Sequence, residues 1–220
     1  MTDNCSLIKY LTPNYFTDSD HPDIIAFTQK HINADDPDTE KVVKLYYAIR
    51  DGFMYNPNTI NISREAFVAS LFLKRNNGHC VDKANLLAAC ARAAGIPGRL
   101  GFANVSNHIG TSQLEKTLGS NVLVFHGFTE LFLEGKWVKA TPAFNKSLCE
   151  KLGVQPLEFD GTEDSIFQEY TEKGGRFMEY LHYYGSFAEF PYELMLSEWQ
   201  RHYPHLFEKA VSGGKIVDIK

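Results

Sequence analysis

The sequence has little positive charge, few cysteines and no long apolar run, and each shortage excludes a class of protein. Its 22 lysine and arginine residues are outnumbered by 27 acidic residues, which gives a formal net charge of −5. No basic side chains cluster into the positive surface that nucleic acids bind, so we expect no nucleic-acid partner. No segment approaches the ~18 uninterrupted apolar residues of a transmembrane helix, so we expect no membrane partner either.

The cysteines are scattered along the chain, at Cys5, Cys80, Cys90 and Cys149. Their spacing suggests neither a disulfide framework nor a metal knuckle. The first ten residues lack the positively charged start and apolar stretch of a secretory signal peptide. We therefore predict a soluble cytoplasmic protein with reduced thiols and with no metal or other cofactor.

The order of the expected elements indicates an α+β fold, because helices come first and strands follow instead of alternating with them. At 220 residues with 44% hydrophobic content, the chain is long enough for a single domain with one core. From apolar spacing and turn residues we predict helices over 23–31, 38–50, 64–75, 80–94 and 191–203, and strands over 99–105, 121–133 and 137–140. The last two strands are expected to form a hairpin.

Cys80 is the first candidate catalytic residue. It follows a turn that contains Gly78 and begins a strongly helical stretch that ends at Gly95. A thiol at a helix N-terminus lies near unpaired backbone N–H groups and the positive end of the helix dipole, which favour the thiolate. Cys90 lies among alanines of the same helix and is expected to be a buried structural thiol.

His126 is the second candidate, because it is a polar residue in an otherwise apolar predicted strand. A lone histidine in such a strand is more often a satisfied interior residue than a base, and its ring requires a polar partner. The Cys80 thiol would supply one. The imidazole would take the thiol proton, and the sulfur would then attack a carbonyl carbon.

Four segments in chain order carry a family resemblance. Residues 78–84, 92–99, 126–131 and 136–138 together resemble the transglutaminase-like core, in which a G-x-C motif opens the catalytic helix and an H-x-[WFY]-x-E motif begins the histidine strand. Residues 50–55 are also similar, so the resemblance covers about residues 50–145. It implies a papain-like fold in a stand-alone, bacterial-type member, in which N-terminal helices and the nucleophile helix pack on an antiparallel sheet. Residues 146–220 would be an elaboration of the same domain, 1–220.

The resemblance also implies a Cys-His-Asp triad whose acid comes just after the strand that contains Trp137. Thr141 stands at that position in this sequence. A threonine can orient the ring of His126, but it carries no charge to stabilise an imidazolium. Asn145, four residues further on, is the alternative, because its amide oxygen can orient the imidazole as in Cys-His-Asn proteases.

Other polar residues near the candidates have simpler explanations. Glu130 shares a strand face with His126 but lies too far along the strand for a tight contact, and we expect it to hold a neighbouring loop. The acidic cluster at 160–164 is expected to be a solvated turn. Cysteine and histidine are zinc ligands, and four of them can be considered together: His79, Cys80, His108 and His126. They lack the spacing that is usual for zinc ligands, so we predict no metal site there.

These observations support two functions of different classes. The first is a cysteine-dependent enzyme that cleaves or exchanges an amide bond of a peptide or other amide substrate, through a thioester on Cys80 with His126 as base. Hydrolysis is favoured over cross-linking, because a small stand-alone core resembles the hydrolytic members. The second is a non-catalytic binding or scaffolding module, for which the threonine at 141 argues. Neither the substrate nor the oligomeric state can be read from the sequence.

Overall fold

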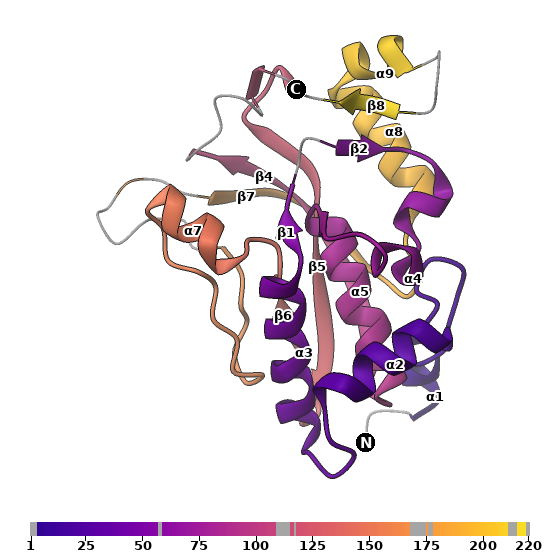
Figure 1. The fold of residues 1–220 in the computed structure, drawn as a ribbon. Coiled ribbons are helices and arrows are strands. Elements are labelled where there is room, and N and C mark those ends of the chain that lie inside the picture. Colours follow the sequence, from indigo (N-terminus) through magenta and orange to yellow (C-terminus); the bar gives the residue numbers. More distant parts are fainter. Residues whose placement is uncertain are drawn as a thin grey trace.

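The computed structural model describes residues 4–56, 59–108, 115–116, 118–167, 175, 178–210 and 215–218. Figure 1 shows the arrangement of its elements. In chain order they are α1 (Asn4–Leu7), η1 (Ile8–Tyr10), α2 (Pro22–His31), α3 (Asp38–Gly52), β1 (Met54–Tyr55), β2 (Thr59–Asn61), η2 (Arg64–Phe67), α4 (Ala69–Phe72), β3 (Asn77–Gly78), α5 (Cys80–Ala93), β4 (Gly98–Asn107), β5 (Val122–Leu133), β6 (Lys136–Ala140), α7 (Lys146–Leu152), β7 (Met178–Phe187), α8 (Tyr192–His202), α9 (Pro204–Ala210) and β8 (Lys215–Asp218).

The main sheet has four strands in the order β6-β5-β4-β7, and every pairing in it is antiparallel. Strands β5 and β6 form the hairpin expected from the sequence, and β4 lies between β5 and β7. Two small pairs stand apart from it, a parallel one between β1 and β3 and an antiparallel one between β2 and β8. The predicted α+β class, with its antiparallel sheet, is confirmed. No helix among the described residues is long and apolar enough to cross a membrane.

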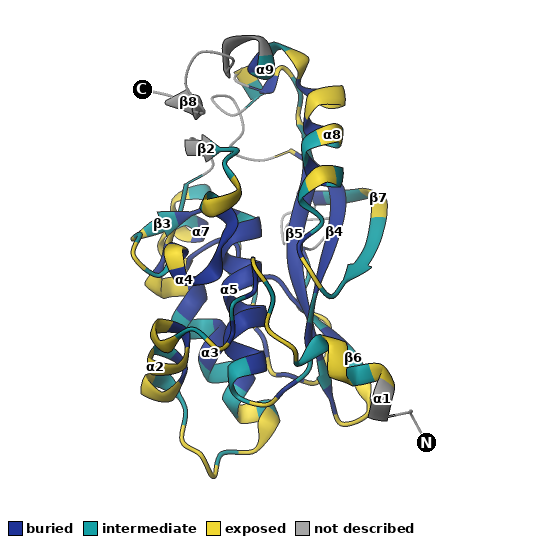
Figure 2. Ribbon diagram, turned by 90° about the vertical axis from the view of Figure 1, so that its right-hand side faces the viewer, coloured by how far each residue is buried: buried dark blue, intermediate teal, exposed yellow. Residues whose placement is uncertain are grey.

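Helix α5 packs against β5 and β4, and nearly all of its residues are buried (Figures 1 and 2). The helix can approach the sheet closely because small side chains face it. The Thr129 hydroxyl donates a 2.7 Å hydrogen bond to the carbonyl of Ala84, and a side chain at Gly98 would come within 3.3 Å of the carbonyl of Ala88. Gly95 ends the helix with a φ of +81°, a conformation that glycine adopts without strain.

A buried lysine joins α5 to the end of α3. The ammonium group of Lys83 donates to three backbone carbonyls, at 2.8 Å to Arg50, 2.8 Å to Phe53 and 2.9 Å to Ala143. Two of these carbonyls lie at or just beyond the C-terminus of α3, where helical carbonyls lack partners within the helix. Burial lowers the pKa of Lys83 to about 7, and the three acceptors, which match the three N–H groups of the ammonium form, oppose that fall.

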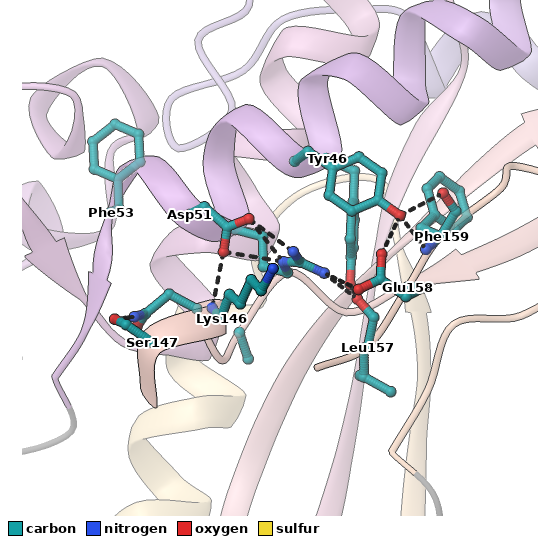
Figure 3. Close-up of polar contacts among 12 residues, drawn as sticks. Tyr46, Asp51, Phe53, Lys146, Ser147, Leu157, Glu158 and Phe159 are labelled. Atoms are coloured by element: carbon teal, nitrogen blue, oxygen red, sulfur yellow. Dashed lines mark hydrogen bonds and ion pairs between the residues drawn. The ribbon is translucent and has the colours of Figure 1, made fainter. Parts of the chain in front are cut away.

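Arg50 extends this network toward the segment that follows α7, and Figure 3 shows three of its partners, Asp51, Leu157 and Glu158. Its guanidinium pairs with Asp51 at 2.8 Å and with Glu158 at 3.2 Å, and it donates to the Leu157 carbonyl at 2.7 Å. The Lys146 N–H donates to the same Asp51 carboxylate. Each donor therefore has an acceptor, which is the condition under which buried charges are tolerated.

The helix predicted over 64–75 is wrong as a continuous element. The chain forms the short turn η2 and the separate four-residue helix α4, with Val68 between them in extended conformation. Tertiary hydrogen bonds replace helical ones at this break, because the Ala69 N–H donates to the Phe16 carbonyl and the Ser70 N–H to the Asp18 carboxylate. The edge strand β7 was not predicted from the sequence.

Candidate active site

Cys80 is the first residue of α5, and the two residues before it set the start of the helix. Gly78 packs so tightly that a side chain there would lie 2.5 Å from the Phe72 ring and 2.7 Å from the Asp82 carboxylate. That carboxylate accepts the His79 N–H at 3.0 Å, which fixes the first turn in the manner of a capping box. The Cys80 side chain is partly buried and contacts two of the apolar clusters of the core.

Gly127 brings the start of α5 against the strand that carries His126. A side chain at this position would meet the Val81 Cα at 3.1 Å and the Phe102 ring at 3.3 Å, so helix and strand could not approach as closely with any other residue. The Gly127 N–H reaches the Cys80 sulfur, as do the N–H groups of Val81 and of Cys80 itself. The sulfur therefore lies among backbone donors from both the helix and the strand.

A β-bulge comes immediately before His126. Ala103 of β4 pairs with His126, whereas Val105, only two residues later, pairs with Leu123, so β5 contains an extra residue. Phe125 has a φ of +65°, which is unusual for a bulky side chain. Its N–H donates to the Asn104 side chain at 3.0 Å. The bulge re-aims the strand at the point where the His126 ring enters the site.

Helix α8 and the residue that follows it supply hydrogen bonds to this bulge. The Trp199 indole donates to the Val124 carbonyl at 3.0 Å. The Tyr203 hydroxyl accepts the Val124 N–H at 2.8 Å and donates to the Val122 carbonyl at 2.6 Å. These side chains satisfy the backbone groups that the bulge removes from the sheet. The C-terminal region thus holds the strand segment that precedes His126.

The His126 ring is buried with both nitrogens free of hydrogen bonds. It packs beside the Phe167 ring, with 5.3 Å between the ring centroids. Burial lowers the pKa of His126 to about 4 and raises that of the Cys80 thiol to about 11, although the N–H groups around the sulfur act in the opposite direction. Both groups are therefore neutral at pH 7 in the free protein.

Cys80 and His126 line the same cavity, whose volume is about 60 Å³. The other walls are mostly apolar or aromatic and come from the start of α5, from β5, from the segment before it and from the C-terminal region; they include Val81, Leu118, Leu123, Phe125, Trp199 and Tyr203. The structure therefore brings the two predicted residues together in one cavity, without a direct hydrogen bond between them.

Thr141 follows β6 and is buried. Its backbone is held on both sides, because its N–H donates to the Ser165 carbonyl at 3.0 Å and its carbonyl accepts from the Tyr46 hydroxyl at 3.1 Å. Its side-chain hydroxyl has no hydrogen-bond partner and so does not bond to the His126 ring. The residue expected to orient the imidazole does not do so in this conformation.

The Asn145 amide is used elsewhere, which corrects its expected role. Its oxygen accepts the Tyr55 N–H at 2.9 Å and its nitrogen donates to the Ser147 hydroxyl at 2.8 Å. The residue holds the start of α7 against β1, and it does not bond to His126. Glu130 pairs with Arg99 of the adjacent strand at 2.5 Å, so it ties strands together instead of acting in the site.

Tyr180 of β7 is a polar neighbour of the site, and its place there could not be read from the sequence. Its hydroxyl is buried without a hydrogen-bond partner. Burial raises its pKa to about 12, while the nearby Phe167 backbone and Thr141 hydroxyl act in the opposite direction. Tyr180 therefore lies close to Thr141, although no hydrogen bond of normal geometry joins the two hydroxyls. Its position opposite Val105 of β4 became visible only once the pairing of the unpredicted strand β7 was known.

Of the four residues considered for zinc, three line the same cavity, namely His79, Cys80 and His126, while His108 does not. His79 lies beside Asp82, 3.5 Å from its carboxylate. His108 is exposed at the end of β4 and lies 3.2 Å from the Ser106 hydroxyl. Within the described part of the chain, no group of three or more histidine, cysteine or acidic side chains could hold a metal ion.

Comparison with known families decides the relationship that the motifs suggested. The model of the transglutaminase-like superfamily matches residues 25–142, which is more than half of the chain. The chain belongs to this superfamily. Membership of the transglutaminase-like superfamily supports a cysteine-based enzyme at the level of the family. The matched region contains Cys80, His126 and Thr141 but not α8.

Solved structures show more distant likeness. A protein from Cytophaga hutchinsonii, provisionally named as a cysteine protease, is 20% identical with a TM-score of 0.49, over 64% of this chain and 43% of its own. One from Parabacteroides distasonis, provisionally named as a protease, is 19% identical with a TM-score of 0.39, over 62% of this chain and 25% of its own. This chain thus spans less than half the length of either. No curated protein sequence matches it.

Proposed function

We propose that the protein is a cysteine-dependent hydrolase of a peptide or other amide substrate, with Cys80 as nucleophile and His126 as base and acid. The observation that carries the proposal is the close approach at Gly127. It sets the Cys80 sulfur, at a helix N-terminus, against the strand that presents His126, in a cavity that both residues line. Hydrolysis is preferred to transfer because water needs no second binding site.

The proposed reaction proceeds in two steps. The His126 imidazole accepts the Cys80 proton as the sulfur attacks the amide carbon, and the imidazolium then gives this proton to the leaving amine, which leaves a thioester on Cys80. In the second step, His126 takes a proton from water, whose oxygen attacks the thioester carbon. The carboxylic acid is released and the proton returns to the sulfur. One amide bond and one water are consumed.

Backbone N–H groups around the sulfur support the first step. The N–H of Gly127 and the N–H groups at the start of α5 reach the sulfur, and a hydrogen bond to a charged acceptor contributes about 1.5–3 kcal/mol. Negative charge that develops on the sulfur during proton transfer is therefore stabilised by donors that need not reorganise.

A second candidate function is a binding module of the same fold without catalysis. The observation in its favour is the state of His126, whose pKa near 4 contrasts with a Cys80 pKa near 11. Proton transfer from the thiol to the imidazole is therefore unfavourable in the free protein, before the attraction between the resulting charges is counted. The hydrolase therefore requires this transfer to be coupled to attack on a bound substrate.

The two functions differ in whether His126 assists the thiol. The rate of Cys80 alkylation by iodoacetamide can be followed against pH by peptide mass mapping, which separates Cys80 from the other cysteines. For the hydrolase we expect the wild type to react at least tenfold faster than His126→Ala near neutral pH. The two rates should converge above about pH 11, where the thiolate forms without help.

A matched control is His182→Ala, which removes an exposed histidine on β7. Its alkylation profile should equal that of the wild type. Identical profiles for the wild type and His126→Ala at every pH would remove the hydrolase proposal and leave the binding module.

A further inference from the structure

We infer that the cavity beside Cys80 is the subsite for a compact, uncharged apolar group of the substrate, attached next to the carbonyl that Cys80 attacks. This inference rests on the proposed function, because it places the substrate group from the position of the nucleophile. It adds what the reaction alone does not give, which is the chemical class of the substrate.

The cavity walls carry no permanently charged side chain. Among the described residues that line it, none is an aspartate, glutamate, lysine or arginine. Its two histidines are neutral near pH 7, since burial lowers the pKa of both His79 and His126. A charged substrate group would lose its hydration in this cavity without gaining an ion pair, which is strongly unfavourable.

The polar groups of the two aromatic residues from the C-terminal region are already occupied by the backbone. The Trp199 indole N–H donates to the Val124 carbonyl, and the Tyr203 hydroxyl bonds to both the N–H of Val124 and the carbonyl of Val122. To a substrate these side chains therefore present mainly their ring surfaces. A polar substrate group could bond to either of these two side chains only by breaking one of these bonds.

Aliphatic side chains line another part of the cavity. Leu118, just before β5, is buried, and Leu123 contacts both apolar clusters that also touch Cys80. The cavity of about 60 Å³ is several times the ~10–15 Å³ needed to hold one water molecule, so it accommodates a group of a few heavy atoms. A short branched aliphatic group matches both this size and this lining.

Part of this subsite lies outside the region shared with the superfamily. Trp199 and Tyr203 come after residue 142, where the matched region ends, whereas Cys80 and His126 lie inside it. The nucleophile and the base thus belong to the common core, and the C-terminal region adds an aromatic wall. Substrate preference would accordingly depend in part on residues outside the matched region.

Thiol reagents test the subsite without a known substrate. Iodoacetamide, its N-isobutyl derivative, an N-(2-aminoethyl) derivative and iodoacetate all alkylate Cys80 in the same way. A sulfur–carbon bond forms, iodide leaves, and the thiol proton passes to His126 or to solvent. Each rate is divided by the rate of the same reagent with the urea-unfolded protein at the same cysteine, which removes differences in intrinsic reactivity.

We expect the normalised rate of the isobutyl reagent at Cys80 to exceed that of iodoacetamide by at least fivefold. The cationic and anionic reagents should both fall below iodoacetamide by at least fivefold. In Leu118→Phe, which narrows the cavity, the advantage of the isobutyl reagent should fall below twofold. Leu181→Phe, at an exposed position of β7, should keep the wild-type ratio.

Equal normalised rates for the isobutyl and parent reagents, or a charged reagent as fast as iodoacetamide, would overturn the subsite. Both comparisons use the wild type alone, so they decide the question even if Leu118→Phe does not fold. The proposed function stands or falls separately, on the difference between the wild type and His126→Ala with iodoacetamide. A protein can therefore fail one test and pass the other.

Discussion

The polar groups around Lys83 and those around His126 are both buried, yet they differ in how completely they are hydrogen bonded. The side chains of Lys83 and Arg50 together bond to four backbone carbonyls and two carboxylates. By contrast, both nitrogens of His126 and the hydroxyls of Thr141 and Tyr180 lack partners. Lys83 and Cys80 lie only three residues apart on α5, so the contrast arises within one turn of the same helix.

An unsatisfied buried polar group costs about 1–3 kcal/mol, so a fold does not gain stability by retaining several of them. The network around Lys83 has the form expected of a group that stabilises the fold. The groups around His126 have the form expected of a site whose partners arrive with a substrate. This difference separates residues that hold the structure from those of the candidate site, although both sets are buried.

The largest effect is expected from Lys83→Met. This substitution removes the donors to three buried carbonyls, so we expect the free energy of unfolding to fall by about 3 kcal/mol or more. Urea unfolding measures the loss. The matched control is Lys74→Met, which changes an exposed side chain with only a 3.9 Å ion pair and should cost less than about 0.5 kcal/mol. Equal costs for the two variants would remove the structural role of Lys83.

The next effect is a pH dependence of stability caused by His126. Its pKa is about 4 in the folded protein and about 6.5 in the unfolded chain, so between these values the unfolded state binds more protons. Stability from this residue is full above about pH 6.5 and is lost as the pH falls toward 4, by up to about 3 kcal/mol.

The measurement compares urea unfolding of the wild type and His126→Gln at about pH 7.5 and about pH 4.5. The wild type should lose more stability than the variant over this interval. If both lose the same amount, the His126 ring is hydrogen bonded in solution and the comparison with the Lys83 network does not hold.

The smallest effect is expected from the hydroxyl of Thr141. Because it has no partner, Thr141→Val should leave the free energy of unfolding unchanged or raise it by up to about 1 kcal/mol. Thr129→Val is the matched control, since that threonine is equally buried but donates to the Ala84 carbonyl at 2.7 Å. The free energy of unfolding of Thr129→Val should fall by about 1–2 kcal/mol. Similar losses in both variants would show that the Thr141 hydroxyl is satisfied.

Helix α5 and the first three strands of the sheet could be predicted because their signals are local. The predicted helix over 80–94 corresponds to α5 at Cys80–Ala93. Glycines mark its two ends, because Gly78 leaves no room for a side chain and Gly95 has a positive φ. The fold could also be predicted, because the motifs around Cys80 and His126 occur in a fixed order along the chain.

Strand β7 could not be predicted, for a physical reason. It lies at the edge of the sheet, its residues are mostly half-buried or exposed, and Gly185 within it has a φ of +109°. Such a strand lacks the regular alternation of apolar and polar residues that marks a strand with one buried face. Its existence depends on pairing with β4, which is distant in sequence.

The hydrogen-bond partners of individual polar side chains could not be predicted from the sequence either. Lysine is usually a surface residue, so Lys83 would be expected to face solvent in the first turns of α5, yet it is fully buried. Asn145 has the right chemistry to orient an imidazole, but its amide is engaged by Tyr55 and Ser147. These outcomes depend on which backbone carbonyls and N–H groups the tertiary fold leaves without partners.

The bulge before His126 implies that the candidate site depends on residues beyond the matched region. A fragment that stopped at residue 142 would retain Cys80, His126 and the whole region that the superfamily shares. It would lose the indole and the phenol that bond to Val124, and the strand would be free to return to regular pairing with β4. Residues that are remote in sequence and lie outside the matched region thus help to hold the strand that carries His126.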